Sequence, residues 1–226
     1  VKVIFTATGY DSNDYFKIWT AKQTMYGKKY LISDHGAVWE KEESFGLIRK
    51  TADLFLTWNQ YDFNDSIQVP INIDLKKKKF LRKNKGNKIL LLANDTARYC
   101  VRLQTGPIAG QILEDYQLWK IFTQELLFQI KKNLIFRPHP LDDWNLAKRY
   151  SIDFGEKYIT NKKNFKEDLN RSKIIINTSL QTTFYQSMKT GIPTIILFNR
   201  KTLNINPKLL KLQNSFLENK IFFKNP

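Results

Sequence analysis

The 226-residue sequence contains little cysteine and histidine, and it has no long apolar run. Cys100 is the only cysteine, which excludes an internal disulfide and is compatible with a cytosolic compartment. One cysteine and two histidines also disfavour a zinc site. No apolar run reaches the roughly 18–20 residues that a membrane-spanning helix needs. The first residues, Val1–Thr6, have the pattern of a core strand and not of a signal peptide.

Acidic residues are also scarce, because 21 Asp and Glu stand against 37 Lys and Arg, for a formal net charge of +16. A chain this basic is expected to meet anionic partners, which include nucleic acid, anionic lipid and phosphorylated substrates. A genome composition that enriches Lys, Asn and Ile is an alternative explanation. The length and the apolar fraction of 42% suffice for one large domain or two small ones with a buried core.

Short apolar runs alternate with amphipathic stretches along most of the chain, which predicts a parallel α/β architecture. The predicted strands are Val1–Thr6, Tyr30–Ser33, Leu54–Trp58, Lys88–Ala93, Leu134–Phe136, Ile174–Ile176 and Pro193–Phe198. The predicted helices are Asp14–Tyr26, Gly110–Lys131 and Leu180–Thr190. Gly191 and Pro193 follow the last of these helices and form a good stop signal.

A nearly all-basic segment, Lys76–Lys88, contains no acidic residue and directly precedes a new strand. It predicts a linker between two α/β units, which cover residues 1–75 and 76–226. A nucleic-acid site would need aromatic residues interleaved with the lysines, but the segment has only Phe80. A solvated linker, or a patch that touches anionic lipid, is therefore the favoured interpretation.

Polar residues follow the predicted strand Leu134–Phe136, in the order Arg137-Pro138-His139-Pro140. The carboxyl ends of parallel strands share one edge of the sheet, where ligands bind. Prolines on both sides of His139 fix the backbone and so aim its side chain. An imidazole can donate a hydrogen bond to phosphate or a proton to a leaving group, and the guanidinium of Arg137 suits phosphate. A structural histidine in a proline-rich turn is the alternative.

A second polar group follows the predicted strand Ile174–Ile176, about forty residues further along the chain. Asn177-Thr178-Ser179 ends the strand, and Thr182-Thr183 opens the next helix. Backbone amides and the dipole at a helix N-terminus favour an anion, and hydroxyl groups there add hydrogen bonds. Plain helix capping is the alternative. Together the two segments predict a site for a phosphate-bearing ligand.

The other histidine, His35, follows the predicted strand Tyr30–Ser33 in the sequence Ser33-Asp34-His35-Gly36. Gly36 permits a tight turn or a close backbone approach. An Asp-His pair can do acid–base work. The alternative is an ordinary turn in which Asp34 caps the following segment.

Taken in order, these segments resemble a family of bacterial surface-polysaccharide transferases of the GT-B type, related to the retaining Kdo transferases of lipopolysaccharide and capsule synthesis. The resemblance covers most of the chain. The matching segments are Ile4–Ala7, Asp14–Ala21, Ser33–Gly36, Ala52–Trp58, Arg98–Tyr99, Arg137–Pro140, Asn177–Phe184 and Gly191–Ile195. The resemblance implies a GT-B-like fold, with a cleft between two Rossmann-like units and an N-terminal unit that is incomplete at Val1.

The resemblance also implies how a nucleotide-activated donor binds. His139, with Arg137, would contact the phosphate of a CMP-linked sugar and stabilise it as it departs. Ser179, Thr182 and Thr183 would bind the same phosphate from the helix N-terminus. Neither a metal nor a cofactor is implied, because a CMP-linked sugar has no pyrophosphate to neutralise. The CMP-linked sugar itself is the substrate.

The resemblance assigns further residues to the cleft. His35 and Gly36 would line it from the N-terminal unit, with His35 also a catalytic candidate, and Arg98 would line it from the other. If the reaction retains configuration it needs a carboxylate nucleophile, for which Asp95 and Asp14 are the candidates.

One motif departs from the family pattern, which usually has Gln-His-Gly-Gly where this chain has Asp34-His35-Gly36-Ala37. Together with the abrupt start at Val1, this departure fits an incomplete or degenerate copy of the family.

The implied function is transfer of Kdo, or of a related acidic sugar, from a CMP-activated donor to a bacterial surface glycan or glycolipid. Such a protein would work in the cytoplasm at the inner face of the membrane, where basic charge favours peripheral contact with anionic lipid. No nucleic acid is expected as a partner. The two alternatives are a CDP-alditol phosphotransferase, for glycerol or ribitol, and a non-catalytic basic module that binds nucleic acid or membrane.

Overall fold

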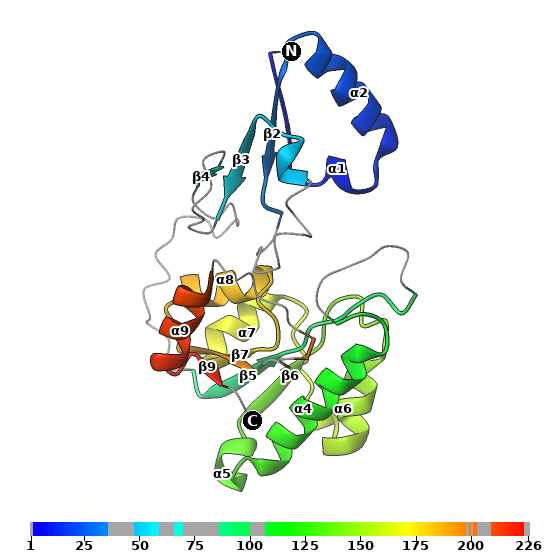
Figure 1. Ribbon diagram of the computed structural model, residues 1–226. Coiled ribbons are helices and arrows are strands. Elements are labelled where there is room, and N and C mark those ends of the chain that lie inside the picture. Colours follow the sequence, from blue (N-terminus) through cyan, green and yellow to red (C-terminus); the bar gives the residue numbers. More distant parts are fainter. Residues whose placement is uncertain are drawn as a thin grey trace. The chain divides into compact units, whose positions relative to one another are not determined.

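In the computed structural model the chain forms two parallel sheets with flanking helices (Figure 1). The structure describes residues 2–35, 48–58, 66–69, 86–99, 107–197, 199, 201–202 and 209–223. The chain divides into two compact units, Val1–Ile73 with Ile205–Leu210 and Asp74–Asn204 with Lys211–Pro226. The predicted α/β fold with two Rossmann-like units is confirmed. The cleft expected between the units stays a prediction.

The first unit contains a four-stranded parallel sheet with the order β1-β2-β3-β4. Its strands are β1 (Val3–Thr6), β2 (Lys29–Ser33), β3 (Leu54–Thr57) and β4 (Ser66–Gln68), and the helices α1 (Gly9–Ser12) and α2 (Asp14–Met25) connect β1 to β2. Helix α2 begins where the sequence predicts, because the side chain of Asn13 accepts a hydrogen bond from the amide of Phe16. Phe16 packs on a small core that includes Ile32 and Phe55 of the sheet.

The second unit contains a five-stranded parallel sheet with the order β6-β5-β7-β8-β9. Its strands are β5 (Lys88–Leu92), β6 (Leu134–Arg137), β7 (Ser172–Asn177), β8 (Thr194–Leu197) and β9 (Phe222–Phe223). The described helices are α4 (Gln111–Glu125), α5 (Phe128–Lys131), α6 (Leu146–Phe154), the 3-10 helix η1 (Glu156–Tyr158), α7 (Phe165–Arg171), α8 (Thr182–Lys189) and α9 (Leu210–Glu218). None of the helices that the structure describes is long and apolar enough to cross a membrane.

Alternate residues of the central strands face opposite layers of helices, as expected when both faces of a parallel sheet are covered. Leu91 and Phe136 belong to a core that α4 and α6 complete. Leu90 and Ile135 belong to a second core, which includes Leu169 of α7. Because each fully buried side chain of this kind contributes about 1.5–3 kcal/mol, these two cores hold the strand ends in place.

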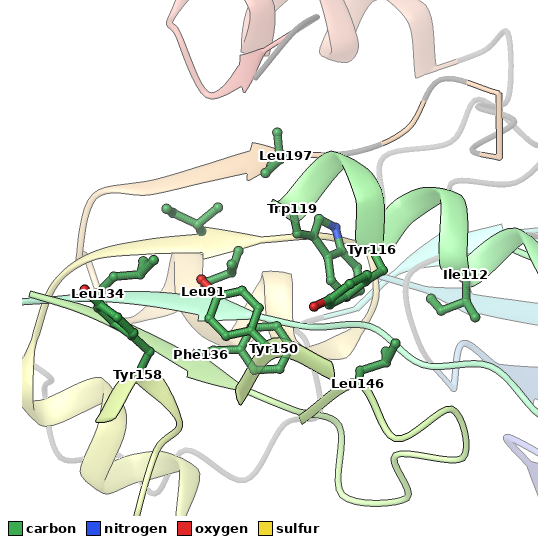
Figure 2. Close-up of a cluster of buried hydrophobic side chains, with 11 residues drawn as sticks. Leu91, Ile112, Tyr116, Trp119, Leu134, Phe136, Leu146, Tyr150, Tyr158 and Leu197 are labelled. Carbon is green, nitrogen blue, oxygen red and sulfur yellow. The ribbon is translucent and has the colours of Figure 1, made fainter. Parts of the chain in front are cut away.

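Aromatic side chains fill the first of these cores (Figure 2). The rings of Phe136 and Tyr150 are stacked with their centroids 4.2 Å apart, and Trp119 lies 6.3 Å from Phe136. The buried hydroxyl groups of Tyr150 and Thr123 share a hydrogen bond of 2.7 Å. The strand that carries His139 is therefore anchored by α4 and α6 along one whole face.

The single helix predicted over Gly110–Lys131 is in fact two helices. The backbone is extended at Leu126 and Leu127, with ψ of 130° and 142°, and this separates α4 from α5. No glycine or proline marks the break, so local sequence signals did not reveal it. Helices α6, α7 and α9 and strands β4 and β9 were also missed.

Candidate functional site

The carboxyl ends of β5, β6 and β7 lie side by side in the second sheet. Strand β5 lies between β6 and β7, and its last residue, Leu92, is paired with Arg137 of β6 on one side and with Asn177 of β7 on the other. The two polar segments found in the sequence therefore flank β5 at one sheet edge, which we call the carboxyl edge. Asp95 follows β5 at the same edge.

Hydrogen bonds fasten the loops that leave these strands. The hydroxyl of Thr178 donates to the carbonyl of Leu92 at 2.8 Å and accepts from the amide of Asn94 at 2.8 Å. The amide of Ala93 donates to the carbonyl of Arg137 at 3.0 Å. The polar residues that follow the strands are thus held at defined positions beside one another.

His139 is half-buried, and its Nδ1 lies within hydrogen-bond distance of a backbone amide. The amide of Leu141 donates to its Nδ1 at 3.3 Å. A neutral imidazole whose Nδ1 accepts a hydrogen bond carries its proton on Nε2. The Nε2–H group is therefore the part of the ring that can donate to a ligand.

A carboxylate cluster adjoins His139. Asp142 caps α6 by accepting from the amides of Leu146 and Ala147, at 2.6 and 3.1 Å. Burial raises the pKa of Asp142, the two amides lower it, and smaller effects come from Asp95, which raises it, and His139, which lowers it. The amide of Asp143 donates to the carboxylate of Asp95, so the loop that holds His139 and Asp142 adjoins Asp95 at the carboxyl edge.

Three buried polar atoms of the described carboxyl edge have no hydrogen-bond partner: Asp95 Oδ1, Thr96 Oγ1 and Asn177 Oδ1. The other carboxylate oxygen of Asp95 accepts from the amide of Asp143 at 2.8 Å. Native proteins leave few buried polar groups unpaired, and such groups call for an explanation, for which a bound ligand is one candidate. Because they gather at the ends of β5 and β7, this edge is the candidate binding site.

Helix α8 begins at the same edge, directly after the loop that follows β7. Its cap residue is Gln181, whose side chain makes no capping hydrogen bond. The side chains of Ser179, Thr182 and Thr183 are half-buried around this end. Backbone amides at a helix N-terminus, hydroxyl groups and the helix dipole together favour an anion.

Arg137 is engaged elsewhere in the structure. Its guanidinium forms an ion pair of 2.6 Å with the fully buried Asp168, and it donates to the carbonyls of Lys162 and Lys163 at 2.9 and 3.0 Å. This geometry favours a positioning role, in which Arg137 fixes the end of β6 against α7. The phosphate contact expected of Arg137 stays a prediction.

The remaining predicted residues lie at several places. Arg98 is exposed and lies over the ring of Trp144, 5.3 Å from its centroid. Asp14 is the exposed first residue of α2 and pairs with Lys17 at 2.9 Å. His35 is exposed after β2 in the first unit, and Gly36 lies outside the described residues.

Asp34 has a structural role that the sequence did not reveal. Its side chain is buried, and Oδ2 accepts from the hydroxyl of Thr57 and the amide of Trp58, both at 2.7 Å. These bonds tie the end of β2 to the end of β3 and leave His35 facing solvent. Burial raises the pKa of Asp34 to about 6, although both hydrogen bonds act to lower it.

We predict that Asp34→Asn stabilises the first unit at pH 7.5. The pKa of Asp34 is 3.8 in the unfolded chain and about 6 in the folded one. Between these two values the folded chain binds a proton that the unfolded chain has lost, so the free energy of unfolding falls as the pH rises from 3.8 to about 6. The side chain of asparagine accepts the same two hydrogen bonds and carries no charge. Removing the buried charge should therefore raise the free energy of unfolding at pH 7.5 by at most about 3 kcal/mol. Urea unfolding of the intact chain should show that Asp34→Asn is more stable than the wild type at pH 7.5. The difference in the free energy of unfolding should be smaller at pH 4.

Asp53→Asn is the matched control in the same sheet. The hydrogen bond from Lys29 is the largest factor that lowers the pKa of Asp53, and the amide of Tyr30 adds to it. The charged form of Asp53 therefore stabilises the folded chain, and Asp53→Asn should lower the free energy of unfolding at neutral pH. A gain at pH 7.5 for Asp53→Asn, or none for Asp34→Asn, would contradict the burial argument.

Within the residues that the structure describes, no three His, Cys, Asp or Glu side chains gather as metal ligands. A comparison with protein families matches residues 1–226 to the model described as LIC12162 family transferase. Neither a curated protein nor a solved structure matches the chain. The prediction of a transferase is thus confirmed at the level of the family. Because the match spans the whole chain, this protein belongs to the LIC12162 family of transferases.

Proposed function

We propose that the chain transfers a sugar, Kdo or a related acidic sugar, from a CMP-activated donor to a bacterial surface glycan. The observation that carries this proposal is the composition of the carboxyl edge. It combines the imidazole of His139, the start of α8, where Gln181 makes no capping hydrogen bond, and three buried polar atoms without partners among the described residues. Such a set suits a ligand that carries a phosphate anion and several hydroxyl groups.

The departing phosphate is the group that the edge would stabilise. When the bond between the sugar and the CMP phosphate breaks, the electron pair goes to a phosphate oxygen. His139 Nε2–H and the amides of Thr182 and Thr183 would donate hydrogen bonds to that oxygen. Donors that the fold already holds in place need little reorganisation when negative charge develops on the phosphate, so they stabilise it effectively. The half-buried position of His139 strengthens this interaction by limiting screening by water.

Asp95 is our preferred carboxylate for a retaining reaction. The amide of Asp143 holds Oδ2, so the carboxylate is oriented, and Oδ1 has no hydrogen-bond partner among the described residues. In this scheme a carboxylate oxygen bonds to the anomeric carbon as CMP leaves. An acceptor hydroxyl then attacks the anomeric carbon, the bond to the carboxylate breaks, and a general base takes the hydroxyl proton. Asp14, exposed in the first unit, is the second candidate, and His35 is a candidate for acid–base work on the acceptor.

The proposed partners follow from charge. The net charge of +16 would favour docking of the protein on the anionic face of a membrane, where acceptor glycolipids are assembled. A CMP-linked donor has no pyrophosphate, so the proposed reaction calls for no metal. No nucleic acid is part of the proposal.

Donor turnover tests the proposal and separates it from the alternative phosphotransferase. We expect the intact chain to release CMP from CMP-Kdo faster than the spontaneous rate, and Asp95→Asn to abolish this acceleration. Release from CDP-glycerol and not from CMP-Kdo would replace the proposal by the CDP-alditol reaction. Failure to accelerate either reaction, with no binding of CMP, would overturn both.

A further inference from the structure

The second unit has a basic pocket at the amino ends of its strands. The pocket has a volume of ≈ 260 Å³. It is lined by Lys88, Lys132, Leu134, Ile135, Glu156, Lys157, Ile159, Asn161 and Arg171. The lining residues give the pocket four cationic groups against a single carboxylate, that of Glu156.

The lysines of this pocket are available to a ligand. None of the ion pairs found among the described residues involves Lys88, Lys132 or Lys157. Lys157 rests over the ring of Tyr158, with Nζ 5.2 Å from its centroid. An isolated surface lysine is ordinarily solvated, but three around one concave pocket repel one another and favour an anion between them.

Arg171 supplies a rigid donor on the same wall. Its Nε and Nη2 donate to Asp168 at 3.0 and 2.7 Å, and Nη2 also donates to the hydroxyl of Thr160 at 2.9 Å. The described hydrogen bonds leave Nη1 unused. A guanidinium held on one side in this way is preorganised to bind an oxyanion with its other side.

The size of the pocket limits its ligand. Pockets for drug-sized ligands typically measure about 300–1,000 Å³, so ≈ 260 Å³ is small for a complete nucleotide. It corresponds to the volume of about eight or nine water molecules, which is enough for one phosphate group and part of its carrier.

The pocket is also separate from the carboxyl edge. Lys88 and Leu134 open strands β5 and β6, whereas Asp95 and His139 follow the other ends of the same strands. A five-residue strand spans roughly 13 Å, so a ligand of this size cannot occupy both places.

We propose that this pocket is a second anion site, which binds a phosphate monoester group carried by a small molecule or by a lipid headgroup. The proposal does not depend on the sugar-transfer function, because none of the pocket residues belongs to the carboxyl edge.

The test uses the double variant Lys132→Ala/Lys157→Ala of the intact chain, since both side chains are exposed and their loss should not affect folding. The matched control is Lys148→Ala/Lys189→Ala, which removes two exposed lysines outside the pocket. Circular dichroism melting first establishes that all three proteins are folded. Calorimetric titration with inorganic phosphate and co-sedimentation with vesicles of phosphatidylcholine and phosphatidic acid then measure binding.

We expect phosphate binding by the wild type and by the control variant, and binding about tenfold weaker or more in the pocket variant, because charge-assisted hydrogen bonds are lost. Loss of vesicle binding in the pocket variant alone would identify a lipid headgroup as the source. Vesicle binding that is equal in all three proteins, with phosphate binding lost in the pocket variant, would identify a free phosphate compound. Equal phosphate and vesicle binding by both variants, or no binding of either probe to the wild type, would overturn the proposal.

Discussion

His139→Ala is expected to weaken CMP binding by about tenfold to a hundredfold, the effect of losing one hydrogen bond to a charged group. The Nδ1 atom of the imidazole accepts a hydrogen bond from the amide of Leu141. In the neutral ring this leaves Nε2–H as the donor to the phosphate. Alanine removes this donor. The side chain is half-buried and belongs to neither hydrophobic core, so the fold should be retained.

Isothermal titration of the intact chain with CMP measures this effect. His139→Gln is the informative companion variant, because its amide can donate over a similar reach and should recover part of the affinity. Lys148→Ala, an exposed change on α6, should bind CMP as the wild type does. Equal affinity of His139→Ala and the wild type would remove His139 from the proposed site.

Asp168→Ala is expected to destabilise the second unit by about 3–5 kcal/mol, the range for removing one member of a buried ion pair. The carboxylate of Asp168 is fully buried and pairs with two arginines, Arg137 at 2.6 Å and Arg171 at 2.7 Å. It also accepts from the hydroxyl of Thr160 at 2.9 Å. Alanine would leave two partly buried guanidinium groups beside each other without their common anion.

Glu167→Ala is the matched control, one residue away in the same helix. Glu167 is exposed and lies 3.8 Å from Lys162, a surface pair worth at most about 1 kcal/mol. Urea unfolding of the intact chain, followed by circular dichroism, compares the two variants with the wild type. If Asp168→Ala lowers the free energy of unfolding by no more than Glu167→Ala does, the buried ion pairs of Asp168 do not stabilise the second unit.

Short apolar runs that end in polar residues were sufficient to predict the carboxyl edge. In a parallel sheet all strands point the same way, so Arg137 and Asn177 had to lie at the same edge of the sheet. The strand order remained open in the sequence. That β5 lies between β6 and β7, and so brings Asp95 between the two segments, emerges only from the pairing of Leu92 with both neighbours.

Contacts between distant residues could not be predicted in the same way. Asp168 is 31 positions from Arg137, and nothing in the local sequence of either residue indicates their ion pair. Asp34 resembles an ordinary turn residue until the end of β3 is placed beside it. The basic pocket is likewise lined by lysines from three separate segments of the chain. In the sequence each of these lysines has the pattern of a solvated surface residue.

Calorimetric titration of the intact chain with CMP, beside a salt series with single-stranded RNA, tests whether the carboxyl edge binds a nucleotide. The proposed site predicts saturable binding of one CMP per chain that His139→Ala weakens. The positive charge alone would predict RNA binding whose affinity falls steeply with salt. Binding of RNA in that manner, together with no binding of CMP, would contradict a nucleotide-sugar transferase and favour a basic binding module.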